Sequence, residues 1–146
     1  MGRIVVGVDG STNGERALRW AVEEARLRDA ELELLVAIPP AGLFDAVTAA
    51  RSREDLEADA TSLLERVLDE VVLPSVDTSE VSVHRTVRTG AAAEALCEVA
   101  READAELLVV GARGRGGFTG LLVGSVAQQV VAHAPCPVVV VVPEGR

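Results

Sequence analysis

The sequence predicts an open α/β fold, in which five parallel strands form one sheet with helices on both faces. Short apolar runs alternate with longer segments of helical spacing, in the order βαβαβαβαβ, and this order favours a parallel sheet. Most of the runs are continuously apolar, as expected for strands that are buried on both faces. The chain has 146 residues, of which 49% are apolar, so we expect a single domain, residues 1–146, with one substantial core.

The first half of the chain contains two strands and two helices. Residues 3–8 form an apolar run that ends in a turn, and Ser11 or Thr12 then caps a helix that continues to about residue 29. Residues 31–38 form a second strand, which two prolines end. The second helix has the clearest apolar face, with steps of three and four residues. That face consists of Leu56, Ala60, Leu63, Leu64, Val67, Leu68 and Val71.

The second half of the chain contains three strands and two helices. Residues 81–88 alternate between apolar and polar side chains, so we expect a half-exposed strand at an edge of the sheet. A helix follows, to about residue 103, and residues 107–110 form the fourth strand. Residues 126–132 have helical spacing, and residues 138–142 form the fifth strand. The apolar side of the last helix is predicted to carry Val126, Val130 and Val131.

The composition excludes several classes of function. The formal net charge of −9 disfavours nucleic acid and anionic membrane surfaces as partners. All fourteen basic residues are arginine, so neither a P-loop lysine nor Schiff-base chemistry is available. Cys97, Cys136, His84 and His133 have no metal-ligand spacing. The longest run of large apolar residues, 138–142, is too short to span a membrane. Since the sequence also lacks a signal-peptide pattern, we expect a cytoplasmic protein.

A glycine-rich segment, residues 111–125, connects the fourth strand to the last helix. It reads GARGRGGFTGLLVGS and holds six of the thirteen glycines. Glycine permits positive φ and the close approach of a ligand to the backbone. The start of the helix offers unpaired N–H groups at the positive end of its dipole, and Arg113 and Arg115 add positive charge. These features indicate an anion site, with phosphate as the best-fitting anion. A flexible surface loop is the alternative interpretation.

Asp9 ends the first strand and has two interpretations. In an open α/β sheet, ligands bind beyond the carboxyl ends of the strands, where the strand order reverses. If the first and fourth strands are neighbours there, Asp9 and the glycine-rich segment face one crevice. The carboxylate could then bond a ribose hydroxyl or hold a metal ion through water. Alternatively, it is only a turn residue of the sequence Asp9-Gly10-Ser11.

The glycine spacing fits a mononucleotide better than a dinucleotide. The dinucleotide fingerprint places its glycines after the first strand, whereas here they follow the fourth. In addition, Gly114-Arg115-Gly116 is followed by Thr119 where a third small residue is expected. No strong general base stands beside the segment, since His133 is a helix length away. The sequence therefore predicts no catalytic residues.

The chain resembles the universal stress protein family over essentially its whole length. Gly111 and Gly114 are separated by two residues, and nine further residues precede the pair Gly124-Ser125. This spacing is similar to the ATP-binding pattern of that family. The opening IVVGVDGS, residues 4–11, and the closing PCPVVVV, residues 135–141, look like the family's first and last strands.

The resemblance implies a Rossmann-like sheet with strand order 3-2-1-4-5, and binding of ATP with or without Mg²⁺. Carried over by position, Asp9 meets the ribose and adenosine region, and the backbone of Ala37 meets adenine. The glycine-rich segment then holds the phosphates and ribose. The complete set of expected ATP-binding residues is Val8, Asp9, Ala37, Val110, Gly111, Arg113, Gly114, Gly124, Ser125 and Val126.

The resemblance also implies homodimers that form through the last strand, Val138 to Val142. An exposed apolar edge strand invites pairing with another chain, and a two-fold axis makes such a contact self-complementary. We therefore expect a regulatory, stress-response module whose protein partner the sequence does not identify. One alternative is an enzyme, either a slow ATPase or a self-phosphorylating protein with Thr119 or Ser125 as acceptor. Another is a dimer in which the nucleotide is only a stabilising ligand.

Overall fold

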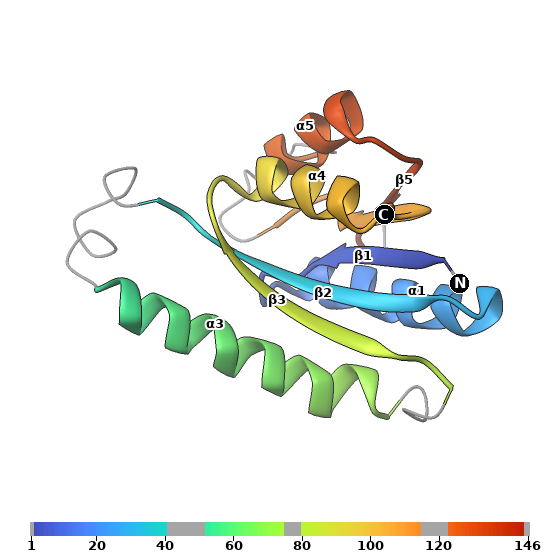
Figure 1. The fold of residues 1–146 in the computed structure, drawn as a ribbon, viewed down its shortest axis with the longest axis horizontal. Helices are drawn as coiled ribbons and strands as arrows, with labels where there is room; N and C mark the ends of the chain where they lie inside the picture. Colours follow the sequence, from blue (N-terminus) through green and yellow to red (C-terminus); the bar gives the residue numbers. More distant parts are fainter. Residues whose placement is uncertain (1, 41–51, 75–79, 115–122, 145–146) are drawn as a thin grey trace.

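The computed structural model describes residues 2–40, 52–74, 80–114 and 123–144. Its five strands form one parallel sheet in the order β3-β2-β1-β4-β5 (Figure 1). The fold class and the strand order are therefore as predicted. The strands are β1 Arg3–Gly7, β2 Glu31–Ile38, β3 Val83–Thr89, β4 Leu107–Gly111 and β5 Val138–Val141.

The helices cover the two faces of the sheet in pairs. One face is covered by α1 and α3, and the other by α4 and α5 (Figure 1). A short π-helix, η1, continues α3, so the long apolar pattern of the second predicted helix extends into a second helical element. The bounds are α1 Thr12–Arg28, α3 Arg53–Val67, η1 Leu68–Val72, α4 Ala92–Glu102 and α5 Ser125–His133.

The core is split by the sheet into two apolar layers. Successive side chains of a strand point to opposite faces. In β1, Ile4 and Val6 therefore pack toward α1 and α3, whereas Val5 packs toward α4 and α5. These three residues are fully buried, as expected for the central strand of a parallel sheet. Cys97 is also buried, and both cysteines are free thiols.

Two elements differ from the sequence-based expectation. The third strand begins at Val83 instead of residue 81, although it lies at the edge of the sheet as predicted. In α5, Ala127 and Val130 form the buried side, while Val126 is 39% exposed and Val131 is 59% exposed. The predicted apolar side of this helix was therefore wrong in part. The small side chain of Ala127 occupies the position three residues before Val130, and this pair sets which side faces the sheet.

A polar cluster lies on the sheet where β1, β2 and β3 begin. Arg3 donates from Nη2 to Glu31 at 2.6 Å and from Nη1 to Glu33 at 3.1 Å. Glu33 is only 7% exposed, and Thr86 donates a second hydrogen bond to it at 3.0 Å. His84 belongs to the same cluster, with its Nε2 3.3 Å from Nη2 of Arg3. Its side chain is 43% exposed.

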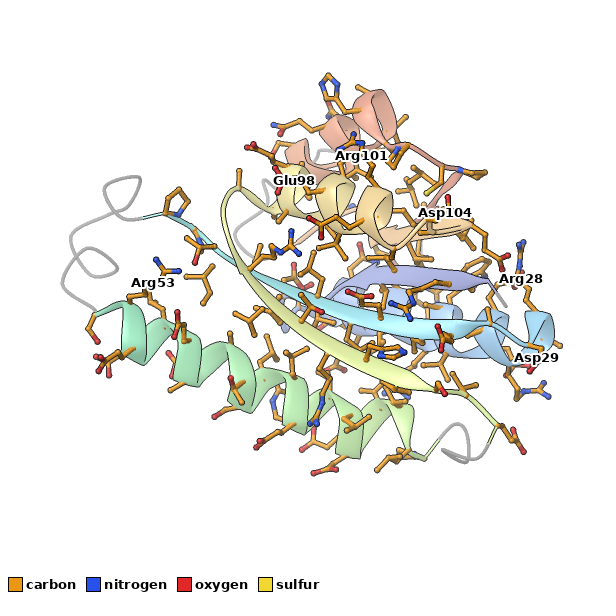
Figure 2. The ribbon with its side chains drawn as sticks, in the orientation of Figure 1. Arg28, Asp29, Arg53, Glu98, Arg101 and Asp104 are labelled. Atoms are coloured by element: carbon orange, nitrogen blue, oxygen red, sulfur yellow. The ribbon has the colours of Figure 1, made fainter. Side chains whose placement is uncertain are left out.

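Residues with positive φ lie at both edges of the sheet. Asp29 ends α1 with φ of 54° and Asp104 follows α4 with φ of 49°. Both precede strands, so they lie at the amino edge of the sheet (Figure 2). At the carboxyl edge, Gly10 follows β1 with φ of 81°. Glycine adopts this conformation without the steric cost that other residues have, and it lets the chain turn sharply after Asp9.

Candidate functional site

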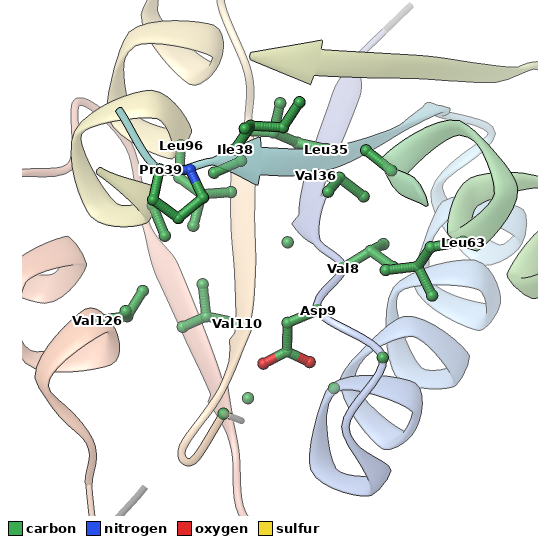
Figure 3. Close-up of a pocket in the computed structure, with 18 of the residues that line it drawn as sticks. Val8, Asp9, Leu35, Val36, Ile38, Pro39, Leu63, Leu96, Val110 and Val126 are labelled. Atoms are coloured by element: carbon green, nitrogen blue, oxygen red, sulfur yellow. The ribbon is translucent and has the colours of Figure 1, made fainter. Parts of the chain in front are cut away.

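A cavity of about 920 Å³ opens at the carboxyl edge of the sheet (Figure 3). Pairing between β1 and β4 ends at Val6 and Val109, and the strand order reverses between these two strands. The residues that follow the two strands therefore separate and leave a crevice. This is the position at which open α/β sheets bind ligands.

All ten residues of the predicted site line this single cavity. They come from the ends of β1, β2 and β4 and from the start of α5, which the fold brings together from distant parts of the sequence. They are Val8, Asp9, Ala37, Val110, Gly111, Arg113, Gly114, Gly124, Ser125 and Val126. The part of the glycine-rich segment that contains Arg115, Gly116 and Thr119 lies outside the described residues.

The upper wall of the cavity is apolar and includes exposed backbone of β2. Leu35 is the last β2 residue paired with β1, and its carbonyl accepts a hydrogen bond from the N–H of Val8 at 2.8 Å. In a parallel strand, the main-chain groups of alternate residues point to the same side. The backbone of Ala37 therefore faces the β1 side beyond the last β1 partner. Ile38 and Pro39 continue this wall (Figure 3).

Asp9 closes a turn and also points its carboxylate into the cavity (Figure 3). Its Oδ1 accepts hydrogen bonds from the N–H and the hydroxyl of Ser11, at 2.9 and 2.6 Å. Oδ2 approaches the backbone of Gly114 so closely that a Cβ added there would lie 2.6 Å from it. The turn role that the sequence suggested is therefore present. The carboxylate also borders the space beside the glycine-rich segment, so the ligand role stays a prediction.

The described loop glycines serve close approach instead of positive φ. A Cβ on Gly111 would lie 3.1 Å from Oδ1 of Asn13, and one on Gly124 would lie 3.2 Å from the carbonyl of Ala112. Gly124 has φ of −74°, which any residue can adopt. Among the described residues, only Gly10 and Gly90 are glycines with positive φ. The expectation that the glycines of residues 111–125 are needed for their backbone angles is thus not met at these positions.

Two helices begin at the cavity without a side-chain cap. The N-cap residues of α4 and α5 are Ala91 and Gly124, and neither makes a side-chain capping bond. In contrast, Ser11 caps α1 and Ser52 caps α3. Uncapped first turns present free N–H groups and the positive end of the helix dipole. The cavity therefore has a positive electrostatic bias on the side of α4 and α5.

Arg113 adds a cation whose hydrogen-bonding capacity is incompletely used. Its Nε is buried and has no hydrogen-bond partner within the described part of the chain. A buried donor without a partner destabilises the protein, and an acceptor atom in the cavity would relieve that penalty. A second cation, Arg66 of α3, lies beside Gly10. Its Nη1 stands 3.8 Å from Glu15 and 3.9 Å from Glu70.

Sequence reasoning missed two parts of the site. Asn13 holds the start of the glycine-rich segment, through a bond from the N–H of Arg113 to its Oδ1 at 2.7 Å. It looked like an ordinary residue of a helix start, and no local pattern distinguishes it. The other part is the wall contributed by α3 and α4. The residues of that wall are Leu56, Asp59, Ala60, Ser62, Leu63, Arg66, Ala92 and Leu96.

The α3 side of the wall is the border of the apolar face predicted for that helix. Leu56 and Leu63 belong to this face, and both are only partly buried, because the cavity lies beside them. Their place on the helix was predicted, but the sequence did not show that they border a cavity. Asp59 is exposed and also lines the cavity.

Other kinds of site are not indicated by the described residues. They contain no group of three or more His, Cys, Asp and Glu side chains that could hold a metal ion. No helix among them is long and apolar enough to cross a membrane. The cavity at the carboxyl edge is thus the candidate site among the described residues.

The sheet order and the cavity at its switch point define an open-sheet α/β protein with its candidate site between β1 and β4. A model of the universal stress protein family matches residues 1–142. The chain therefore belongs to the universal stress protein family, as the glycine spacing predicted.

Two of the similar relatives are universal stress proteins of mycobacteria. A universal stress protein of Mycolicibacterium smegmatis is 36% identical over 146 residues, which cover 96% of this chain and 45% of the relative. One of Mycobacterium tuberculosis is 32% identical over 140 residues, covering 94% and 46%. The chain spans about half the length of these relatives.

Solved structures of the family share the fold. The universal stress protein UspA from Lactobacillus plantarum superposes with a TM-score of 0.80 at 25% identity, covering 96% of this chain and 97% of that one. The Archaeoglobus fulgidus protein in complex with dAMP has a TM-score of 0.73 at 29% identity, covering 97% and 98%. A universal stress protein in complex with cAMP has a TM-score of 0.71 at 28% identity, covering 96% and 95%.

Proposed function

We propose that this chain binds ATP in the cavity at the carboxyl edge of the sheet. The observation that carries the proposal is the composition of the cavity, which combines an apolar wall with an electropositive wall. Val36, Ile38 and Leu63 form part of the first, and the uncapped start of α5 with Arg113 forms the second. A nucleotide has the same division between an apolar base and charged phosphates. Two solved relatives are complexes with the adenine nucleotides dAMP and cAMP, which supports the assignment.

The base and the ribose occupy the part of the cavity next to β1 and β2 in this proposal. The backbone of Ala37 lies beyond the paired part of β2 and provides the hydrogen-bonding edge for adenine. Asp9 lies below this wall in Figure 3, and its Oδ2 lies beside the backbone of Gly114. There its carboxylate accepts hydrogen bonds from ribose hydroxyls. Leu63 and Val8 contact the base from the α3 side.

The phosphates occupy the part next to Gly114 and the start of α5. The first-turn N–H groups of Ser125 and Val126 donate to phosphate oxygens, and the helix dipole favours the negative charge. Nε of Arg113 gains the acceptor that it lacks. If Mg²⁺ accompanies ATP, the phosphates and water supply most of its ligands, because Mg²⁺ keeps several waters. Asp9 is then the carboxylate beside Gly114 that bonds those waters.

We further propose that the protein acts in the cytoplasm as a homodimeric regulatory module, with β5 as the dimer contact. In the described sheet, β5 pairs with β4 on one side only, and Val138, Val139 and Val140 are only partly buried. An apolar edge of this kind favours pairing with a second copy. Regulation of a partner by nucleotide occupancy is the role that follows from binding without rapid turnover.

The proposal is tested by identifying the nucleotide that the protein carries and prefers. Freshly purified protein is denatured, and the released ligand is separated by chromatography and identified by mass spectrometry. Calorimetric titrations with ATP, GTP and adenosine follow on nucleotide-free protein. We expect ATP to bind more tightly than GTP and adenosine. Equal, weak binding of all three by a folded protein would contradict the proposal.

A turnover assay distinguishes the regulatory module from the enzymatic alternative. We expect phosphate release and self-phosphorylation to be slow, since general base catalysis requires a base within hydrogen-bond reach of the attacking group. His133 lies at the far end of α5 from the cavity. Rapid ATP hydrolysis by pure protein, sensitive to changes in the cavity, would favour an enzyme.

A further inference from the structure

Asn13 lies at a junction of three elements that meet beside the cavity. It stands in the first turn of α1 and is 8% exposed. Its Nδ2 donates to the carbonyl of Val141, at the end of β5, at 3.0 Å. Its Oδ1 accepts from the N–H of Arg113, at the start of the glycine-rich segment, at 2.7 Å. Both ends of the carboxamide are therefore used, by two segments far apart in the sequence.

These two contacts require an amide. One neighbour is a carbonyl, which needs a donor, and the other is an N–H, which needs an acceptor. A carboxylate supplies only acceptors, and an alanine supplies neither. The two partners also fix which end of the amide is oxygen. The carbonyl of Val141 accepts a further bond from the N–H of Ala112 at 2.8 Å, so the same oxygen receives two donors.

The backbone at Ala112 and Arg113 is held by hydrogen bonds, while the Arg113 side chain keeps an unused donor. The N–H groups of Ala112 and Arg113 are bonded to Val141 and Asn13, and the carbonyl of Ala112 accepts from the N–H of Gly124 at 2.6 Å. The start of α5 is thus hydrogen-bonded to Ala112, beside Arg113. In contrast, Nε of Arg113 is buried without a partner among the described residues. A fixed backbone that carries an unused donor is the arrangement of a preorganised anion site.

We propose that Asn13 is the positioning residue of this site, acting through Arg113. Its carboxamide holds the Arg113 backbone against the end of β5. It thereby fixes the position of the guanidinium and the distance between Arg113 and the start of α5. Asn13 does not line the cavity, so its effect on a phosphate is exerted through the residues that it holds. The inference rests on the proposed binding of ATP at the same cavity.

The test compares two substitutions at Asn13 with a neighbouring control. Asn13→Ala removes both bonds, whereas Asn13→Asp keeps the acceptor for Arg113 and loses the donor to Val141 when it is ionised. Thr12→Ala, at the exposed preceding position, is the control. Each folded protein is titrated with ATP and with adenosine, which lacks phosphates. We expect Asn13→Ala to weaken ATP by roughly tenfold or more, the equivalent of about 1.4 kcal/mol, and to change adenosine binding much less.

Asn13→Asp adds a pH profile that a general loss of stability would not produce. The pKa of the introduced carboxyl is set by burial and the Val141 carbonyl, which favour the protonated form, and by the Arg113 N–H and the start of α1, which favour the charged form. Below that pKa the protonated carboxyl donates to the Val141 carbonyl as the amide does. We expect ATP affinity, divided by that of wild type in the same buffer, to be low at pH 8 and to recover toward pH 5. The wild-type reference removes the titration of ATP itself.

An NMR measurement separates failure of this proposal from failure of the proposed function. The hydrogen exchange of the Arg113 amide should accelerate in Asn13→Ala and stay slow in Thr12→Ala, whichever ligand binds. If wild type binds no ATP, the proposed function fails, and this exchange result still tests the positioning role. Unchanged exchange would overturn the proposal, as would equal losses of ATP and adenosine affinity or a flat pH profile for Asn13→Asp. Should Asn13→Ala not fold, the profile of Asn13→Asp decides.

Discussion

The guanidinium of Arg113 has a buried Nε that lacks a hydrogen-bond partner in the described structure. Arg113 lines the cavity, and a buried donor without a partner among the described residues is available to a ligand there. The start of α5 lies in the same part of the cavity. At the scale of single residues, the site is therefore defined by unsatisfied donors rather than by a reactive side chain.

Replacing Arg113 should discriminate between ligands with and without phosphate. We expect Arg113→Gln to weaken ATP by about ten- to a hundredfold, because a hydrogen bond to a charged group contributes about 1.5–3 kcal/mol. Adenosine affinity should change little. The measurement is calorimetry with both ligands, and Arg101→Gln on the exposed side of α4 is the control (Figure 2). If adenosine and ATP weaken equally, Arg113 does not contact the phosphates.

At the scale of elements, the pairing of β1 with β2 is supported by ion pairs at the amino edge of the sheet, opposite the cavity. Arg3 of β1 joins Glu31 and Glu33 of β2, and it holds the strands together where they begin. The hydrogen bond from Arg3 lowers the pKa of Glu31 below its ordinary value of 4.5, with the positive charge of Arg3 as a further cause. A carboxyl with a lowered pKa stabilises the folded state above its unfolded pKa.

The pH dependence of stability follows from this direction of shift. As pH falls below 4.5 and through the lower pKa of the folded state, the stabilisation from Glu31 should be lost. We expect the free energy of unfolding, measured by urea denaturation between pH 6 and 3, to fall less steeply in Glu31→Gln than in wild type. The exposed Glu94→Gln serves as the control. A Glu31→Gln curve parallel to that of wild type would show that the Arg3 contact does not affect stability.

For the whole molecule, much of the fold could be predicted from local patterns. Continuous apolar runs such as residues 4–6 and 107–110 are typical of buried parallel strands, because they are too short for helices and alternate with segments of helical spacing. The start of β3 and the buried side of α5 differed from the prediction. Alternation at residues 81–88 extends beyond the paired stretch, and Ala127 contributes too little apolar volume to reveal its side of the helix.

Site residues could be predicted where a sequence pattern identifies them. They could not be predicted where only contacts between distant segments bring them to the cavity. The rule for open sheets brought Asp9 and the glycine-rich segment to one crevice, and the resemblance to the family supplied the remaining residues, such as Ala37. Asn13 depends on contacts with Arg113 and Val141, which are 100 and 128 positions away, and the α3 wall likewise reaches the cavity only through the fold. No local spacing encodes such contacts.

The exposed edge strand β5 predicts that the protein forms a dimer. Substituting Glu at Val142, which is 50% exposed, should weaken a dimer formed through β5 without disturbing the core, since the added charges repel across a two-fold axis. Val140→Glu should weaken it further but also affects packing toward α4 and α5. Sedimentation equilibrium at micromolar concentration checks both variants. A wild-type monomer under these conditions would contradict the proposed dimer.

Calorimetry on three proteins tests the claim that the start of α5 and the glycine-rich segment hold the phosphates of ATP. A side chain at position 124 would bring its Cβ within 3.2 Å of the Ala112 carbonyl, so the backbone that joins Ala112 to the start of α5 must shift. We expect Gly124→Val to bind ATP at least about tenfold more weakly than wild type, or about 1.4 kcal/mol. Gly116→Ala, outside the spacing pattern, should bind ATP nearly as wild type does. Equal ATP affinity in all three proteins, each shown by circular dichroism to be folded, would contradict the claim.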